Sequence, residues 1–269
     1  MTDIEPLDLR FSADELAEQR AHIESFIEER LDAAGVERAV LGLSGGVDST
    51  TTAYLAVEAL GKENVHGLVM PGEVSDADNM TDAERVAEEL GIEYDVLEIN
   101  PIVDEFLNAV PEAEGDRLAV GNARARTRAV LNYLVANHEG GLVLGTGNRT
   151  EAAIGYFTKY GDGAVDCHPI GNLYKQQVRQ LAADLGAAQE LVEKTPTAGL
   201  WAGQTDEEEI GMDYDTLDAV VALTIDGEVP PEATADIADT TVENVQHVRD
   251  LHAKSEHKRH VPPAPEQLF

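Results

Sequence analysis

Residues 39–60 constrain the fold more than any other part of the chain, because a strand, a glycine turn and a helix follow one another without a break. The apolar run 39–43 precedes the turn, and residues 50–60 are compatible with a helix that ends at Gly61. The turn between them has the sequence Ser44-Gly45-Gly46-Val47-Asp48-Ser49. Glycines let the backbone approach an anion closely, and the first N–H groups of a helix are unpaired donors. The segment therefore predicts a phosphate-binding turn.

This turn differs from the Gly-x-x-x-x-Gly-Lys-Ser/Thr loop of common nucleotide hydrolases, because no lysine follows its glycines. Asp48 instead stands where its negative charge would repel phosphate. We therefore expect a cation beside Asp48. The alternative is that this carboxylate only stabilises the dipole at the start of the helix.

Apolar runs of strand length alternate with helical patterns through the first half of the chain. The expected strands are 39–43, 65–70, 94–99 and 142–144, and the expected helices are 14–31, 50–60, 76–90 and about 122–137. This alternation predicts an α/β fold, a doubly wound parallel sheet flanked by helices. Residues 145–173 are rich in glycine and charge, so we expect an irregular segment of the kind that binds ligands at the carboxyl ends of parallel strands.

The rest of the chain has mainly helical patterns. Helices are expected at 175–185, 213–223 and 241–257, followed by a proline-rich tail. We expect one domain, residues 1–269, made of an N-terminal helix (1–35), a nucleotide-binding α/β core (36–200) and a helical C-terminal part (201–269).

The formal net charge of −33 limits the partners of this chain. Such a surface repels nucleic acids and anionic membranes, so we expect neither as a partner. It also indicates a salt-loving host, because at about 1 M salt the Debye length falls to about 3 Å and self-repulsion is screened. An acidic protein from a mesophile is the alternative. The single cysteine, Cys167, excludes an internal disulfide, and without a signal pattern or a membrane-length apolar run the protein is expected in the cytoplasm.

Positive charges are scarce and concentrated. Eight of the 19 basic residues lie within residues 117–179, which indicates an anion site there. Lys175 opens a helix after the glycine-rich segment, and Thr197 lies in a proline-containing turn that could present its hydroxyl to phosphate. Glu151 follows a strand end, as Asp48 does, so both carboxylates could approach one Mg²⁺. The alternatives are a solvated lysine, a plain connecting turn and a surface carboxylate.

Three arginines occupy every second position of an expected helix: Arg124, Arg126 and Arg128. Steps of two residues turn through about 200°, so the three side chains cannot share one face. We expect Arg126 to point towards the protein, and Arg124 and Arg128 to face solvent.

Several blocks of the sequence resemble known enzymes. The turn at 44–49 resembles the pyrophosphate-binding loop of the ATP pyrophosphatases, which cleave ATP to AMP and pyrophosphate. Four further blocks are similar to the ammonia-dependent NAD⁺ synthetase family: Gly-Asn-Ala-Arg-Ala-Arg-Thr-Arg from 121, Gly-Thr-Gly-Asn-Arg-Thr-Glu from 145, Gly-Tyr-Phe-Thr-Lys-Tyr-Gly-Asp-Gly from 155 and Glu-His-Lys-Arg from 256. The resemblance runs from about residue 44 to residue 259 and implies an adenine nucleotide alpha hydrolase-like fold.

The resemblance also implies where ligands bind. ATP contacts are implied at Gly42, Leu43, Ser44, Gly45, Gly46, Val47, Asp48, Ser49, Thr146, Lys175 and Thr197. Magnesium is implied at Asp48 and Glu151. Contacts to deamido-NAD⁺ are implied at Arg126, Lys159, Asp166, His257 and Lys258, and the implied catalytic residues are Lys175 and Asp166.

Two further features follow from the same resemblance. The family forms a homodimer in which the dinucleotide lies across the subunit interface. Many bacterial members have Gln at the position of Val47 and Asp at the position of Gly199, so these two positions depart from the family pattern.

The implied enzyme is a ligase with two steps. The nicotinate carboxylate of deamido-NAD⁺ attacks the α-phosphate of ATP, pyrophosphate leaves, and ammonia then displaces AMP from the acyl adenylate. Glutamine use would need its own nucleophile domain, so free ammonia, or ammonia supplied by a separate protein, is the expected donor. The alternatives are another ATP pyrophosphatase, such as a tRNA-thiolating or GMP synthetase-type enzyme, and a non-catalytic ATP-binding module. The single cysteine and the acidic charge disfavour tRNA thiolation.

Overall fold

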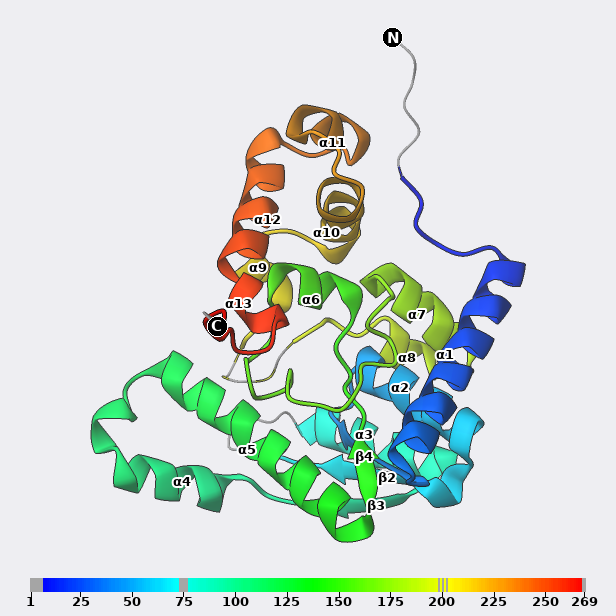
Figure 1. Ribbon diagram of the computed structural model, residues 1–269, viewed down its shortest axis with the longest axis vertical. Coiled ribbons are helices and arrows are strands. Elements are labelled where there is room, and N and C mark those ends of the chain that lie inside the picture. Colours follow the sequence, from blue (N-terminus) through cyan, green and yellow to red (C-terminus); the bar gives the residue numbers. More distant parts are fainter. Residues whose placement is uncertain (1–6, 73–76, 198, 200, 202, 268–269) are drawn as a thin grey trace.

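The computed structural model describes residues 7–72, 77–197, 199, 201 and 203–267 (Figure 1). Within these residues, one parallel sheet is formed by β1 (Arg38–Leu43), β2 (Val65–Val69), β3 (Glu93–Val96) and β4 (Gly141–Val143). The strand order is β3-β2-β1-β4. The chain thus winds outward from β1 to β3 and then crosses back to place β4 on the other side of β1. The predicted doubly wound parallel fold is confirmed.

Side chains of β1 alternate between two apolar clusters, one on each face of the sheet. Ala39, Leu41 and Leu43 pack with α1 (Ala13–Ala34), α2 (Val47–Leu60), α3 (Ala77–Leu90) and α7 (Lys175–Asp184). Val40 points to the opposite face, where α4 (Asn100–Ala109) and α5 (Arg117–Glu139) cover the sheet. Because both faces are covered, the central strands β1 and β2 are nearly continuous apolar runs in the sequence, whereas the edge strand β3 is mostly exposed.

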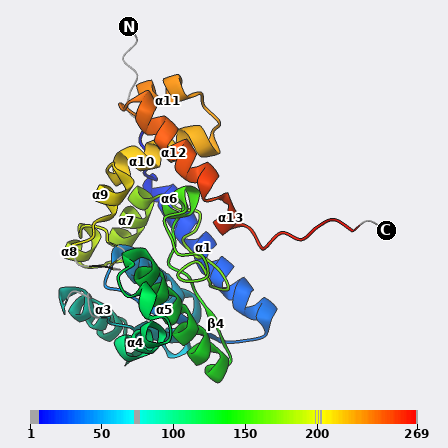
Figure 2. The same ribbon diagram turned by 90° about the vertical axis from the view of Figure 1, so that its left-hand side faces the viewer.

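A third apolar cluster joins helices that lie beyond the sheet in Figure 1. Its helices are α6 (Arg149–Ile154), α9 (Asp206–Ile210), α10 (Tyr214–Val220), the π-helix η3 (Val221–Asp226), α11 (Pro231–Ile237) and α12 (Val242–Lys254). The short elements η1 (Lys62–Asn64), η2 (Pro111–Ala113), α8 (Gln189–Val192) and α13 (Glu256–Arg259) complete the description. After α13 the chain runs away from the body of the protein (Figure 2). The helical C-terminal part is confirmed, and the domain boundary at residue 200 stays a prediction.

Two sequence-based expectations differ from the structure in the type or the end of an element. The strand expected at 94–99 ends at Val96, because the chain turns into α4, whose first turn contains a proline that suits a helix start. Residues 149–154, expected to be irregular, form α6, which is too short to show a helical period. The expected start of a helix at Asp76 lies outside the described residues. None of the described helices is long and apolar enough to cross a membrane.

The position of β4 beside β1 decides where a ligand can bind. The helices that follow β1 and β2 cover one face, whereas the helices that precede β4 cover the other. At such a reversal of strand order, the loops after the two strands leave a crevice between them. The turn at 44–49 follows β1, and residues 144–148 follow β4, where Leu144 also pairs with Cys167. The fold therefore brings the glycine turn and the block from 145 to the same edge of the sheet.

Candidate functional site

The glycine turn after β1 has the geometry of an anion site. Gly45 has a φ of +71°, which a glycine adopts without strain, and Gly46 stands at the start of α2 with no side chain capping the helix. The hydroxyls of Ser44 and Ser49 lie 3.0 Å apart, and the Ser49 hydroxyl donates to the Gly46 carbonyl at 3.1 Å. These bonds fix the turn while the first turn of α2 directs its N–H groups outward. Val47, which stands where many bacterial members have Gln, is buried and therefore lies on the inner side of the turn.

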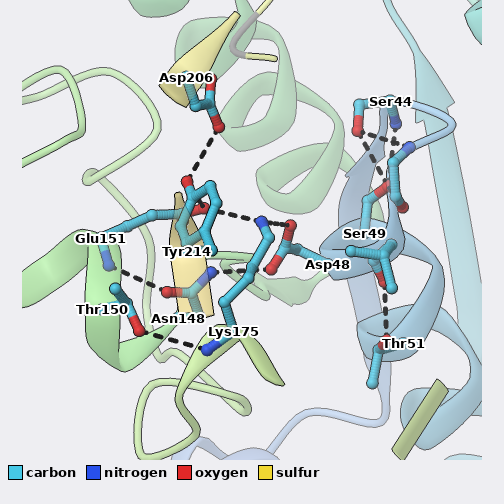
Figure 3. A network of polar contacts seen from close by, with 12 residues as sticks. Ser44, Asp48, Ser49, Thr51, Asn148, Thr150, Glu151, Lys175, Asp206 and Tyr214 are labelled. Carbon is cyan, nitrogen blue, oxygen red and sulfur yellow. Dashed lines mark hydrogen bonds and ion pairs between the residues drawn. The ribbon is translucent and has the colours of Figure 1, made fainter. Parts of the chain in front are cut away.

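A buried lysine lies beside this turn, between two carboxylates (Figure 3). The Lys175 side chain is 2% exposed, and its Nζ lies 2.5 Å from Asp48 Oδ2 and 3.1 Å from Glu151 Oε1. Burial lowers the pKa of Lys175, but the charges of Asp48 and Glu151 outweigh it and raise the pKa above its usual value. Burial, together with the charge of Asp48, raises the pKa of Glu151 to about 7 against the opposing effect of Lys175. Lys175 is therefore a fixed cation, and Glu151 is a carboxylate that holds a proton readily.

One amide bonds both the Asp48 carboxylate and the backbone of Glu151. Asn148 is fully buried, its Nδ2 donates to Asp48 Oδ1 at 2.9 Å, and its Oδ1 accepts the Glu151 N–H at 3.0 Å. The second bond caps α6, since a side-chain oxygen at this position satisfies a free N–H of the first turn. Asn148 thus sets the direction of α6 and the orientation of Asp48 together.

The aromatic ring of Tyr214 packs against the same lysine. The Lys175 Nζ lies 4.8 Å from the ring centroid, a cation–π contact that stabilises the buried charge. The Tyr214 hydroxyl donates to Asp206 Oδ2 at 2.9 Å and lies 3.4 Å from Glu151 Oε1 (Figure 3). The site is therefore closed by α10 on the side away from the sheet.

The donor set suits a hard divalent cation. Asp48 and Glu151 offer carboxylate oxygens, their side chains are each 18% exposed, and the Lys175 ammonium already occupies the space between them as a cation would. No group of three or more His, Cys, Asp or Glu side chains suited to a metal was found in the part of the chain that the structure describes. A metal at Asp48 and Glu151 would thus complete its coordination with phosphate or water oxygens.

The predicted contact at Thr197 lies in a turn that its own hydroxyl stabilises. Thr197 Oγ1 donates to the Gln204 carbonyl at 2.8 Å and accepts the Gly199 N–H at 3.1 Å, and Gly199 has a φ of +59°. Lys194, at the start of this turn, reaches the glycine turn. Its Nζ lies 3.3 Å from the Gly45 carbonyl and pairs with Asp82 of α3. The turn is therefore attached directly to the anion site.

Four residues predicted to contact the dinucleotide come together around residues 155–160. Arg126 donates to the Lys159 carbonyl at 3.2 Å, and Lys159 Nζ contacts the His257 carbonyl. Lys258 Nζ donates to the carbonyls of Gly155 and Phe157 at 2.7 and 2.8 Å. These bonds tie α13 to the segment that carries Lys159.

Gly155 explains how α13 approaches so closely. A Cβ at this position would lie 2.1 Å from Ser255 Cβ, and its φ of +70° also favours glycine. Arg259 strengthens the contact by donating to the carbonyls of Ala152 and Ala153 at the end of α6. The C-terminal helix α13 therefore clamps both α6 and the loop after it.

The other predicted residues are placed as follows. Asp166 lies at the end of β4, where its carboxylate accepts the Val143 N–H at 2.7 Å and the Tyr133 hydroxyl at 3.2 Å. Thr146 follows the same strand and is half-buried, while Gly42 and Leu43 end β1.

The expectation for the arginines of α5 is wrong. Arg126 is the exposed one, whereas Arg128 reaches inward and donates to the Met70 carbonyl at the end of β2 at 3.0 Å. Burial and the neighbouring Arg124 lower the pKa of Arg128 to about 10. The sequence could not show this, because a helix period gives relative angles but not which face meets the sheet.

Comparison with known proteins identifies the same family as the sequence motifs, over most of the chain. The sequence model of the NAD synthase family matches residues 19–262. An NH₃-dependent NAD⁺ synthetase of Halobacterium salinarum is 64% identical over 97% of this chain and 98% of the relative, and one of Methanosarcina mazei is 46% identical over 94% and 99%. The chain belongs to the NAD synthase family.

Solved structures of this family share the fold. An NMN synthetase of Francisella tularensis has a TM-score of 0.83 at 33% identity, covering 96% of this chain and 100% of that one. An NH₃-dependent NAD synthetase of Campylobacter jejuni, solved with a nitrate ion, has a TM-score of 0.77 at 30% identity, with coverages of 93% and 99%. The predicted family is confirmed, and the acidic composition agrees with the halophilic source of the Halobacterium relative.

Several side chains of the NAD synthase site were not predicted individually. Asn148 lies in a block that carried the resemblance, and its spacing to Glu151 is that of a helix cap. Lys194 could have been found from the scarcity of lysine, the signal that drew attention to Lys175. Tyr214 carries no local pattern that points to the site, because the contact with Lys175 depends on how α10 packs on α7.

Proposed function

We propose that this protein makes NAD⁺ from deamido-NAD⁺, ATP and ammonia in the crevice between β1 and β4. The observation that carries the proposal is the fixed cation Lys175, buried beside the glycine turn and between two carboxylates. The relatives named above as NH₃-dependent NAD⁺ synthetases support the same reaction. Membership of this family does not favour a tRNA-thiolating enzyme or a non-catalytic ATP-binding module.

ATP would lie with its phosphates against residues 44–49. The N–H groups at the start of α2 would receive the β- and γ-phosphates, which become the leaving pyrophosphate. Lys175 would stabilise the charge that develops at the α-phosphate as the nicotinate carboxylate attacks. Because Lys175 is buried and always charged, its stabilisation acts in a preorganised environment and needs no rearrangement during the reaction. Gly42, Leu43, Thr146 and Thr197 would contribute the remaining ATP contacts.

Mg²⁺ would be held by Asp48 and Glu151, whose oxygen donors suit it. When bound, this ion neutralises phosphate oxygens and polarises the phosphorus they surround. Asn148 would fix the orientation of Asp48 towards the ion, because its amide donates to one oxygen of that carboxylate.

Deamido-NAD⁺ would be bound near Arg126, Lys159, His257 and Lys258. Arg126 of α5 contacts the backbone of Lys159, so two positively charged residues lie side by side. Such a pair suits the pyrophosphate of a dinucleotide. Lys258 would act by holding that loop, because its ammonium is bonded to the Gly155 and Phe157 carbonyls. Asp166, whose carboxylate is held by Tyr133 and by the backbone of β4, would orient ammonia for attack on the acyl carbon.

A homodimer would cover an apolar hollow on α5. Val130 and Leu134 are 65% and 62% exposed, and with Tyr160 they line a hollow of about 420 Å³. Large side chains of this kind gain about 25 cal/mol per Å² when a second copy removes them from water. Leu134→Asp is expected to shift the protein from dimer to monomer in light scattering at high salt, and an unchanged dimer would exclude this face.

The activity is tested by incubating the purified protein at high salt with Mg²⁺, ATP, deamido-NAD⁺ and ammonium. NAD⁺ and AMP are expected together, and only when ammonium is present. A parallel reaction with the deamidated mononucleotide tests NMN as the product, because the Francisella structure is that of an NMN synthetase. ATP binding without AMP would indicate a binding module, and AMP without NAD⁺ would indicate another acid substrate.

A further inference from the structure

The helix α10 belongs to the C-terminal group of helices (Figure 1), and its residue Asp218 places a buried carboxylate against the starts of α6 and α7. Asp218 is fully buried and lies one helical turn after Tyr214. Its Oδ2 accepts the Gln176 N–H at 2.8 Å, and its Oδ1 lies 3.3 Å from the Lys175 N–H nitrogen. Oδ1 also accepts the hydroxyl of Thr150. One carboxylate therefore touches the start of α7 and the first turn of α6.

These two helix starts carry the two charges that face each other in the site. Lys175 is the first residue of α7, and Glu151 is the third residue of α6. Thr150, directly before Glu151, is fully buried. Its hydroxyl accepts the backbone N–H of Lys175 at 3.2 Å. The spacing between the Lys175 ammonium and the Glu151 carboxylate thus depends on Thr150 and Asp218, which together join the two helix starts.

The π-helix after α10 makes a similar pair of contacts, to the residues that directly precede Thr150 and Lys175 in the sequence. Asp226, its last residue, pairs with Arg149 of α6 and accepts the hydroxyl of Tyr174, the residue before α7, at 2.6 Å. A π-helix widens the turn, and such segments occur frequently at functional sites. Asp218 and Asp226 therefore join the same two helix starts at two levels.

Burying Asp218 is unfavourable by itself. Desolvation raises its pKa to about 6, in spite of the hydrogen bonds from Thr150 and from the first turn of α7 that favour the charged form. A neutral cap such as serine or asparagine would satisfy a helix start without burying a charge. A carboxylate retained there can receive three donors at once, which a neutral side chain of similar size cannot do.

We propose that Asp218 is a positioning residue for the first chemical step, acting through Thr150 and the backbone of α7 to hold Lys175 against Glu151 and Asp48. This inference rests on the proposed function for its kinetic readout. Asp218 does not touch the glycine turn, so it sets the geometry of the charges that act in the transition state and contributes little to ATP binding.

The test compares two carboxylates of the same element. Asp218→Asn keeps the shape but replaces an acceptor by a donor, and it is expected to lower kcat by about 10²-fold, the effect of a displacement of about 1 Å. The KM for ATP is expected to stay within about 3-fold, because a loss confined to the transition state lowers kcat alone. Asp213→Asn is the control. Asp213 is exposed and caps α10 through Thr216, so kcat should stay within about 2-fold.

A purely structural role predicts a different result. Asp218→Asn would then lower the melting temperature but leave kcat per folded molecule like that of Asp213→Asn, and this outcome would overturn the proposal. Thr150→Val provides a second variant if Asp218→Asn does not fold, since it keeps the buried volume and removes the hydroxyl that bonds Asp218 and the Lys175 backbone N–H. It is expected to lower kcat by about 10-fold, and an unchanged kcat would also overturn the proposal.

A crystal structure of each variant without ligands separates this inference from the proposed function. The Lys175 ammonium is expected to move away from Glu151, whatever the substrate is. If the parent protein makes no NAD⁺, the proposed function fails while the structures still test Asp218. If the ammonium keeps its position in both variants, Asp218 is not a positioning residue.

Discussion

The two ends of the sheet each hold a cation between two carboxylates, and only one of these clusters has the surroundings of a site. At the carboxyl end, Lys175 is 2% exposed between Asp48 and Glu151. At the amino end, Arg38 is 30% exposed and lies 2.6 Å from Glu93 and 3.2 Å from Glu139. Both clusters attach to β1, which starts at Arg38 and leads into the glycine turn.

The two clusters differ in the structural elements that surround them. The amino-end cluster joins the starts of β1 and β3 to the end of α5, and His66 of β2 adds a contact of 2.7 Å to Glu139. The carboxyl-end cluster lies beside a turn whose N–H groups point outward. An ion pair therefore does not identify a site in an α/β sheet. What identifies the site is the position of the ion pair at the carboxyl ends of the strands, where α/β sheets bind ligands.

The largest expected difference between the two clusters is in turnover. Lys175→Ala is expected to lower the rate of NAD⁺ formation by about 10²-fold or more, as for removal of one preorganised charge or donor from a transition state. Arg38→Ala is the matched control and should leave the rate within about 2-fold. Initial rates with saturating substrates measure both, and a nearly parental rate for Lys175→Ala would end its assignment.

The second expected difference is in the magnesium requirement. Asp48→Asn is expected to raise the Mg²⁺ concentration that gives half-maximal rate by about 10- to 100-fold, because one of two carboxylate donors is lost. Glu139→Gln removes a carboxylate of the amino-end cluster and should leave the titration unchanged. Circular dichroism checks that Asp48→Asn keeps the fold, and a parental titration curve would remove Asp48 from the metal site.

A smaller effect is expected in the pH dependence of stability without Mg²⁺. The pKa of Glu151 rises from 4.5 to about 7 on folding, so the folded protein binds more protons than the unfolded chain between these values. The free energy of unfolding should therefore fall as the pH rises from about 5 to about 7. Lys175 stays charged throughout this window because its pKa is raised.

Glu151→Gln should flatten this pH profile of the melting temperature. Glu93→Gln should leave the profile between pH 5 and 7 unchanged. The hydrogen bond from Arg38 lowers the pKa of Glu93, so the contribution of Glu93 to stability is lost only at lower pH. Equal slopes for the parent and Glu151→Gln would contradict the raised pKa.

The smallest effect is expected at the amino end itself. Arg38→Met should reduce the free energy of unfolding by about 0.5–1 kcal/mol, since Glu93 is 63% exposed and solvent screens its pair with Arg38. Urea unfolding in low and high salt measures this, and the loss should shrink as salt screens the pair. A loss of several kcal/mol would mean that this cluster is as tightly coupled as the Lys175 cluster.

The sequence was sufficient for the parts that depend on local pattern. Sequence patterns located all four described strands, and the rule for strand ends placed the glycine turn and Glu151 on one edge, whereas Lys175 stood out through the scarcity of lysine. α6 was missed because six residues show no period, and Arg128 was assigned to the wrong face because the packing of α5 on the sheet decides it. Tyr214 and Asp218 could not be predicted, since their contacts with residues 39 and 68 positions earlier arise only from packing of α10.

The capping amide of Asn148 also bears on the chemical lifetime of the enzyme. Asparagine deamidates when the next backbone nitrogen attacks its side-chain carbon, and the product here would set a third carboxylate against Asp48 and Glu151. The Arg149 N–H that would have to attack is bonded to the Leu173 carbonyl at 2.8 Å, and Asn148 is fully buried. The folded site thus protects the one amide whose slow hydrolysis would replace a donor with a repelling charge.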